Sequence, residues 1–291
     1  MPEKISEPYP VDLEFELSQC LEKTLRNAKL QIPNHLSDSI RYSLMAPGKR
    51  IRPRLTLLCA KMFDLPLSAA LPAALAIEMI HCFTLIHDDL PCMDNDEFRR
   101  GKPTNHKVFG ESIALLAGDA LIGLAFTTLL EAAPYVKPQA LLNAIARLAQ
   151  ATGPAGVTGG QAGELTLQYS PSLDGLYTTF GQKTGALFRA AILMPKDLAA
   201  VPFESPQSYS LEYFATELGL AFQMADDLED AAKEKKLPTN ILYYLKTDAI
   251  RKNTLERLGK AKKELLKTWL ESARPLIAIA EEVTKCFTPI H

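Results

Sequence analysis

Apolar residues recur with the helical period along most of the chain, and no convincing alternating strand pattern is present. The segment Val11–Leu30 shows this clearly, since Leu13, Leu17, Leu21 and Leu25 are four residues apart. The same period predicts further helices at residues 34–46, 52–63, 67–87, 111–132, 138–152, 156–168, 173–179, 183–193, 208–235, 240–246, 248–272 and 275–286. The pattern therefore predicts an all-α fold of ten or more helices.

The predicted helices belong to one domain over residues 1–291. No composition break, low-complexity linker or internal repeat divides the sequence, and 291 residues suffice for one large domain. The segment Leu67–His87 is rich in alanine and apolar on most sides, which is typical of a buried helix. We therefore expect this helix at the centre of the domain.

One segment resembles a membrane span, namely Ile113–Leu130. Asp119 lies near its middle, and an aspartate at the centre of a spanning helix costs about 2.5–3.5 kcal/mol. A buried helix of a globular domain is therefore favoured over a membrane span.

Composition narrows the functional classes. A formal net charge of −2 gives no general attraction to nucleic acid or to anionic membranes. The five cysteines contain no C-x-x-C pair, which excludes a typical zinc site or disulfide framework. The first residues have no apolar stretch of the secretory kind, so a cytoplasmic location is expected.

Two aspartate clusters lie within otherwise apolar, helix-forming sequence: Asp88, Asp89 and Asp94 form the first, and Asp226, Asp227 and Asp230 form the second. Two carboxylates 4 Å apart repel by about 4 kcal/mol at an effective dielectric constant of 20. Cations must therefore neutralise such clusters if they are buried. Mg²⁺ uses one or two carboxylates and completes its shell with phosphate oxygens and water. The clusters predict a site that binds a polyphosphate through Mg²⁺; a solvated acidic surface is the alternative.

The second cluster presents one carboxylate face, because Asp226 and Asp230 are four residues apart on a helix. In the first cluster, an uninterrupted helix would place Asp94 about 240° around the axis from Asp88. Pro91 ends or distorts that helix, which lets Asp94 return to the side of Asp88.

Three short basic segments can supply phosphate contacts. They contain Lys49 and Arg52 in G-K-R-I-R-P, Arg99 and Arg100 after the first acidic cluster, and Lys183 in Q-K-T-G. Arginine binds phosphate oxygens with two parallel donors, whereas lysine acts as a point charge. Neither G-x-x-x-x-G-K-[ST] nor G-x-G-x-x-G occurs, so a P-loop or dinucleotide fold is not supported.

Five segments together resemble the trans-isoprenyl diphosphate synthases, specifically the bacterial farnesyl diphosphate synthase type. They are GKRIRP, IHDDLPCMDNDEFRRGKPTNHK, GGQAGEL, KTGALF and FQMADDLED, within a match that runs from about Asp38 to Leu245. Class I terpene cyclases share the fold and the first motif, but they carry an asparagine/serine/glutamate motif where this chain has its second D-D-x-x-D.

The resemblance implies an all-helical isoprenoid synthase fold, usually dimeric, around a central catalytic cavity with three Mg²⁺ ions on an allylic diphosphate. The implied metal ligands are Asp88, Asp94, Asp226 and Asp230, with Asp89 and Asp227 beside them as catalytic residues. The implied contacts to the allylic diphosphate are Arg99, Lys183, Thr184 and Gln223. The implied contacts to isopentenyl diphosphate are Gly48, Lys49, Arg52, His81 and Arg100. His87 and His106 are expected to be structural.

In this family, product length depends on the residues four and five positions before the first aspartate, which here are Thr84 and Phe83. An aromatic residue at the fifth position resembles the farnesyl-producing type, and a smaller residue would allow the twenty-carbon product. Core packing is the alternative role for Phe83. A geranylgeranyl or geranyl diphosphate synthase, a non-catalytic regulatory paralogue and a terpene cyclase are the alternative functions.

The chain departs from the family pattern directly after Asp230. Relatives have a longer loop there with two lysines, whereas this chain continues with AAKEKKLPTNILYYL. Lys236 is expected to match the second lysine, and Lys233 is the candidate for the first. Because this loop normally closes over the diphosphates, closure and turnover are in question.

Overall fold

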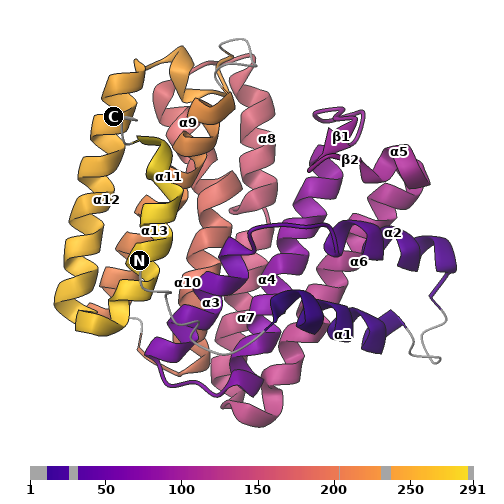
Figure 1. Ribbon diagram of the computed structural model, residues 1–291, viewed down its shortest axis with the longest axis horizontal. Helices are drawn as coiled ribbons and strands as arrows, with labels where there is room; N and C mark the ends of the chain where they lie inside the picture. Colours follow the sequence, from indigo (N-terminus) through magenta and orange to yellow (C-terminus); the bar gives the residue numbers. More distant parts are fainter. Residues whose placement is uncertain (1–11, 26–31, 203, 231–236, 288–291) are drawn as a thin grey trace, which may run out of the picture.

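The computed structural model describes residues 12–25, 32–202, 204–230 and 237–287, and these residues are almost entirely helical (Figure 1). The α-helices are α1 (Leu13–Leu25), α2 (Asn34–Leu44), α3 (Ile51–Met62), α4 (Leu67–Asp88), α5 (Asn105–Phe109), α6 (Glu111–Leu129), α7 (Pro138–Thr152), α8 (Val157–Leu167), α9 (Leu173–Phe180), α10 (Ala186–Leu198), α11 (Pro206–Asp230), α12 (Thr247–Trp269) and α13 (Arg274–Val283). The predicted all-α class with ten or more helices is confirmed.

Short elements join these helices. Strands β1 (Phe98–Arg99) and β2 (Lys102–Pro103) form a small antiparallel hairpin that the sequence pattern did not predict. A π-helical turn, Gly181–Gly185, precedes α10, so this helical stretch begins earlier and ends later than the predicted 183–193. Four 3₁₀ segments complete the described chain: Leu130–Tyr135, Ile241–Tyr243, Leu270–Ala273 and Lys285–Phe287.

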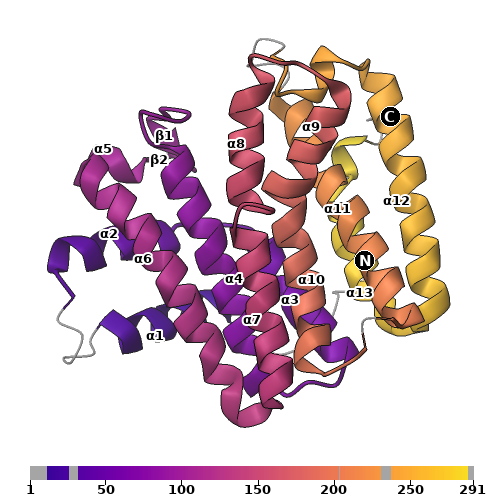
Figure 2. The same cartoon turned by 180° about the vertical axis from the view of Figure 1, so that it is seen from behind.

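Helix α4 is the central helix, as predicted. It packs against α3, α6 and α10, and both views show it in the middle of the molecule (Figures 1 and 2). Most of its side chains are buried in a continuous apolar core that also takes residues from α1, α2, α7, α11, α12 and α13. Its carboxyl end, which carries the first acidic cluster, lies beside the β1–β2 hairpin (Figure 1).

Two helical segments, not one, are long and apolar enough to cross a membrane by length and composition: Leu67–Asp88 and Glu111–Tyr135. The expectation of a single ambiguous segment was therefore wrong. In Leu67–Asp88, 78% of the apolar window is buried, because this segment is the core helix α4. In Glu111–Tyr135 the value is 44%, since α6 carries an exposed apolar face.

Candidate functional site

A cavity of about 610 Å³ lies between α4, α6, α8, α10, α11 and the π-helical turn. Asp88 from the first acidic cluster and Asp226 from the second both line it. The other expected site residues that line it are Arg52, His81, Phe83, Thr84, Arg100, Lys183 and Thr184. Segments up to 174 positions apart in the sequence thus place carboxylates and cations around one space.

The first acidic cluster is shaped by the end of α4. This helix ends at Asp88, and the following loop turns back so that the Asp94 amide donates to the Asp88 carbonyl at 2.9 Å. The predicted return of Asp94 to the side of Asp88 is confirmed. Burial raises the pKa of Asp88 to about 7, with the Asp94 carboxylate acting in the same direction and Lys183 against it. A cation beside Asp88 would therefore relieve an unfavourable charge.

Asp89 is held differently from Asp88. It is buried, and the guanidinium of Arg99 donates from Nε to its Oδ1 at 2.7 Å. Arg99 also donates to Asp96 at 3.2 Å. Burial raises the pKa of Asp89, while Arg99 opposes that rise. Neither Asp89 nor Arg99 is among the described residues that line the main cavity, so the two side chains fix the hairpin to the end of α4.

The second acidic cluster divides in the same way. Asp226 lines the cavity, whereas buried Asp227 accepts from the Gln223 amide at 3.0 Å and from the backbone amide of Ile241 at 2.8 Å. Consecutive residues of a helix point about 100° apart, which explains why the two aspartates face different surroundings. The backbone of Asp230 belongs to α11, and its side chain lies outside the described part of the structure.

Lys183 enters the cavity from the π-helical turn. Such turns occur often at functional sites because they displace one residue from the regular helix. The ammonium of Lys183 is ion-paired with Glu164 of α8. Burial alone would lower the pKa of Lys183, but Glu164 and Asp88 outweigh it and raise the pKa above its ordinary value. The next residue, Thr184, donates to Gln223 at 2.6 Å, so Gln223 is engaged by Thr184 and Asp227.

Arg52 is a second cationic group that lines the cavity. Arg52 is buried, and its guanidinium stands 4.6 Å from the ring centre of Phe188 and 5.5 Å from that of Phe222. Burial lowers the pKa of Arg52 to about 10. Among the described residues, the Nε of Arg52 finds no hydrogen-bond partner. His81 Nε2 lies 3.5 Å from Arg52, and burial together with Arg52 keeps the pKa of His81 well below its usual value of 6.5.

The loop before α3 touches the β1–β2 hairpin. A Cβ atom at Gly48 would lie only 2.6 Å from Nη1 of Arg100, so a larger residue there would displace the end of the Arg100 side chain. Arg100 itself adopts a left-handed backbone conformation with φ of 53°. Lys49 lines a neighbouring cavity of about 340 Å³, which also includes Asp226. The loop before α3 and Arg100 therefore lie side by side, and the cavity that Lys49 lines shares Phe222 and Asp226 with the main one.

The wall below Asp88 is aromatic. Phe83 is buried, lines the cavity and packs edge-to-face on His87, with ring centres 5.6 Å apart. His87 Nε2 lies 3.0 Å from the carbonyl oxygen of Leu115 on α6. A Cβ atom at Gly118 would stand 2.1 Å from this nitrogen, so the histidine ring occupies the space that glycine leaves. His87 was expected to be structural, and it also forms part of the cavity wall.

Sequence reasoning missed Glu164, the partner of Lys183. Glu164 lies in the segment GGQAGEL, which contributed to the family resemblance without a role for its glutamate. In the sequence, Glu164 is a single carboxylate in the predicted helix 156–168, and Lys183 is an isolated cation at the start of the predicted helix 183–193. The expectations for Lys233 and Lys236 fall on positions outside the described residues.

The donor set fits Mg²⁺ only in part. Within the described residues, no group of three His, Cys, Asp or Glu side chains is arranged to hold a metal ion by itself. The carboxylates that line the cavity are hard oxygen donors, and burial makes the charge of Asp88 costly without a counter-ion. Mg²⁺ commonly takes one or two carboxylates and receives its other ligands from a substrate and water. The residues thus fit an ion that arrives with a phosphate.

Comparisons with known proteins identify the family. The family profile "Polyprenyl synthetase" matches residues 33–241, which is most of the chain. The chain belongs to the polyprenyl synthetase family. The resemblance to trans-isoprenyl diphosphate synthases is thereby confirmed, and the prenyltransferases of this family generally depend on Mg²⁺.

Individual members of the polyprenyl synthetase family differ in the product that their names state. The chain is 40% identical over 272 residues to "Geranylgeranyl pyrophosphate synthase 7, chloroplastic" of Arabidopsis thaliana, covering 88% of this chain and 78% of that protein. It is 42% identical over 226 residues to "Farnesyl diphosphate synthase" of Geobacillus stearothermophilus, covering 76% and 75%. The crystal structure of an FPP/GFPP synthase from Zymomonas mobilis is 35% identical and has a TM-score of 0.81, covering 93% of this chain and 98% of that one.

Proposed function

We propose that this protein catalyses the Mg²⁺-dependent head-to-tail (1′-4) condensation of isopentenyl diphosphate with dimethylallyl or geranyl diphosphate. The products are (2E,6E)-farnesyl diphosphate and pyrophosphate. The observation that carries the proposal is the meeting of Asp88 and Asp226, two aspartates from distant clusters, with Arg52 and Lys183 around one cavity.

The charges of the cavity suit the ionisation of an allylic diphosphate. When the C–O bond breaks, the leaving pyrophosphate gains negative charge, and a fixed cation stabilises that charge most in the transition state. Lys183 stands beside Asp88 and retains its charge, because Glu164 and Asp88 raise its pKa. Each 1.4 kcal/mol of such stabilisation gives about a tenfold increase in rate.

Bound Mg²⁺ would neutralise the diphosphate and stabilise the departing charge. Asp88 and Asp226 are the described side chains best placed to hold it, with Asp94 and Asp230 as the further ligands that we propose. We propose that three Mg²⁺ ions bind together with the diphosphate.

Isopentenyl diphosphate would bind beside Arg52. The buried Arg52 guanidinium has an unsatisfied Nε, and a diphosphate oxygen would supply the acceptor. His81 is neutral beside it and can donate a hydrogen bond without adding charge. Arg100, Lys49 and Gly48 complete the proposed contacts.

The reacting carbons would lie in the apolar part of the cavity. The isopentenyl double bond attacks the allylic cation and forms the new carbon–carbon bond. The cation that results then loses a proton to the departed pyrophosphate, which restores a double bond. Phe222 lines the cavity and is backed by the buried Phe188, with ring centres 5.0 Å apart, so this apolar wall would exclude water that would otherwise capture the cation.

Phe83 supports a fifteen-carbon product. It lies five positions before Asp88 on α4, or about 7.5 Å along the helix axis. Its ring packs on His87 and narrows the cavity along which the growing prenyl chain would extend. The geranylgeranyl synthases among the relatives make a twenty-carbon product the alternative.

A homodimer in the cytoplasm is the proposed form of the enzyme. Leu116 and Leu130 of the Glu111–Tyr135 segment and Leu142 of α7 are exposed, and a second copy would cover them. Asp119 lies on the same helix and carries an exposed carboxylate, which disfavours a contact with lipid. Buried thiols at Cys59 and Cys82 that form no disulfide are consistent with a reducing compartment.

The test is incubation of the purified protein with Mg²⁺, radiolabelled isopentenyl diphosphate and either dimethylallyl or geranyl diphosphate. The proposal predicts incorporation of label and farnesol after phosphatase treatment. Geranylgeraniol or geraniol would change the product assignment. Hydrocarbon products without consumption of isopentenyl diphosphate would indicate a cyclase, and an absence of any turnover would indicate a non-catalytic paralogue.

A further inference from the structure

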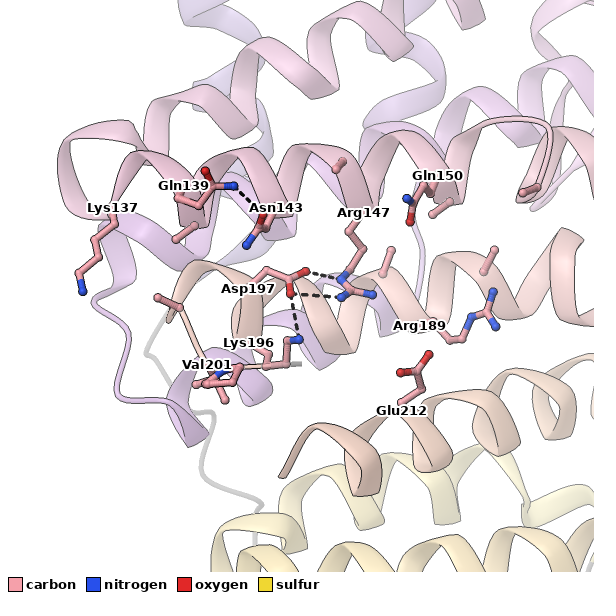
Figure 3. A pocket seen from close by; sticks show the side chains of 18 residues that line it. Lys137, Gln139, Asn143, Arg147, Gln150, Arg189, Lys196, Asp197, Val201 and Glu212 are labelled. Carbon is pink, nitrogen blue, oxygen red and sulfur yellow. Dashed lines mark hydrogen bonds and ion pairs between the residues drawn. The ribbon is translucent and has the colours of Figure 1, made fainter. Parts of the chain in front are cut away.

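A second cavity, of about 880 Å³, lies between α7, α10, the turn after α10 and the start of α11 (Figure 3). It shares no lining residue with the catalytic cavity among the described residues. The two spaces lie on different faces of α10, since Leu187 lines the catalytic cavity while Ala186 and Ala190 line the second one. We call the second space the α7–α10 groove.

The α7–α10 groove has an excess of positive charge. Its cations are Lys137, Arg147, Arg189 and Lys196, and its carboxylates are Asp197 and Glu212. The net formal charge of the whole chain is −2, so this concentration of cations runs against the overall balance. A concave surface focuses such a field and raises the local concentration of anions.

The centre of the groove is built from buried charges. Lys196 and Asp197 are 3% and 6% exposed, and the Lys196 ammonium lies 3.2 Å from an Asp197 oxygen. Arg147 donates to both oxygens of the same carboxylate, at 3.1 Å for the Nη2 contact (Figure 3). One carboxylate therefore faces two cations at a place where solvent screening is weak.

Arg189 supplies the clearest unused donor. It is partly buried on α10, and the described residues provide its side chain with no hydrogen bond or ion pair. Figure 3 shows its guanidinium beside Glu212 of α11 and below Gln150 of α7. A planar guanidinium in such a position fits a phosphate group by two parallel hydrogen bonds.

The remaining surface of the groove suits a small polar ligand. Gln139, Asn143 and Gln150 lie along one side of α7, and the amide of Gln139 donates to Asn143 at 3.0 Å. The rest of the lining is mostly alanine, which leaves a smooth floor. A volume of about 880 Å³ is within the usual range for small-molecule sites.

We propose that the α7–α10 groove is a second binding site, separate from the catalytic cavity, for a phosphate-bearing small molecule. Arg189 and Arg147 contact the phosphate, the buried Lys196 provides long-range attraction, and the α7 amides contact the rest of the ligand.

Calorimetry tests the site with inorganic phosphate and adenosine 5′-monophosphate as separate probes, in the absence of Mg²⁺. Wild-type protein is expected to bind phosphate, and Arg189→Gln is expected to weaken binding by about ten- to a hundredfold, since a charged hydrogen-bond donor is lost. Arg189→Lys should retain part of the affinity. Glu212→Gln should strengthen binding, because it removes the opposing carboxylate. Tighter binding of the nucleotide than of phosphate would show that the alanine-lined part of the groove also contacts the nucleoside. Equal binding would show that the groove contacts the phosphate group alone.

Two controls locate the binding. Arg274→Gln removes an exposed cation outside both cavities, and Lys183→Gln removes a cation of the catalytic cavity. Neither should change phosphate affinity. Phosphate binding that is absent from the wild type, unchanged in Arg189→Gln, or lost in Lys183→Gln instead would overturn the proposal. A change of oligomeric state in Arg189→Gln by light scattering would also overturn it, because the groove would then be an interface between copies.

An assay of prenyl transfer tests the proposed function independently of binding in the α7–α10 groove. Arg189→Gln is expected to turn over at the wild-type rate without phosphate present. If the protein shows no prenyl transfer at all, the calorimetric result on the groove still stands by itself.

Discussion

The guanidinium of Arg50 is ion-paired with the carboxylate of Glu78, and both side chains are at least nine-tenths buried between α3 and α4. Arg50 also donates to Glu14 of α1 at 2.6 and 2.8 Å and to the carbonyl oxygens of Leu44 and Ala46 at 3.0 and 2.9 Å. Its left-handed backbone, with φ of 47°, starts α3. Arg50 therefore fixes the loop that carries the proposed isopentenyl diphosphate contacts.

Replacement of Glu78 by glutamine tests this positioning. Removing one partner of a buried ion pair costs about 3–5 kcal/mol in unfolding free energy when the other charge is left without a partner. Arg50 keeps its ion pair with the exposed Glu14, so we expect a smaller cost of about 1–3 kcal/mol. We expect denaturant unfolding of Glu78→Gln to show a loss of this size. We also expect a larger change in KM for isopentenyl diphosphate than in kcat. The matched control is Glu282→Gln, whose exposed pair with Arg54 spans 3.7 Å and contributes at most about 1 kcal/mol. Equal losses in the two variants would rule out a special role for the buried pair.

Truncation of Phe83 should lengthen the product. Phe83→Ala removes the ring that narrows the cavity wall, so a further isoprene unit has room and twenty-carbon alcohols are expected after phosphatase treatment. Phe214→Ala is the control, because Phe214 is also buried in the core but is not among the described residues that line the cavity. An active Phe83→Ala enzyme that still stops at fifteen carbons would show that Phe83 only packs the core.

The stability of the free protein should depend on pH through His81. Burial and Arg52 keep the pKa of His81 well below 6.5 in the folded state. Below pH 6.5 the unfolded chain therefore binds a proton that the folded chain does not, and the free energy of unfolding falls as pH falls. His81→Gln should show a weaker pH dependence between pH 6.5 and 5 in denaturant titrations. Parallel curves for the variant and the wild type would contradict the assignment of a neutral, buried His81.

The apolar face of α6 should mediate dimerisation. Light scattering is expected to give twice the chain mass of 32.0 kDa for the wild type and a single chain mass for Leu116→Glu, because a charge cannot be buried unpaired at an apolar interface. Leu255→Glu is the control, since Leu255 is exposed on α12, away from this face. A dimeric Leu116→Glu variant would place the interface elsewhere.

Helical periodicity predicted most of the fold, because long apolar stripes leave few alternatives. Helix α7 begins and ends where its pattern predicted, and Pro91 marked the break that returns Asp94 to Asp88. Helix α5 and the β1–β2 hairpin are too short to produce a period. Their formation depends on contacts such as that of Arg99 with Asp89, which the sequence pattern does not show.

The site was predicted in composition but not in detail. Chemistry and spacing pointed to Asp88 and Asp226, and both line the cavity. The different settings of Asp89 and Asp227 depend on partners 10 and 14 positions away along the chain. Glu164 required knowledge of which helix packs on the π-helical turn, and only the folded chain provides that.

The central claim is that Asp88 and Asp226 bind one diphosphate together through metal ions. Mn²⁺ can replace Mg²⁺ so that electron paramagnetic resonance follows the free ion in the presence and absence of pyrophosphate. We predict weak uptake by the protein alone, a large increase when pyrophosphate is added, and loss of that increase in both Asp88→Asn and Asp226→Asn. Tight uptake without pyrophosphate, or full uptake in Asp226→Asn, would contradict the claim.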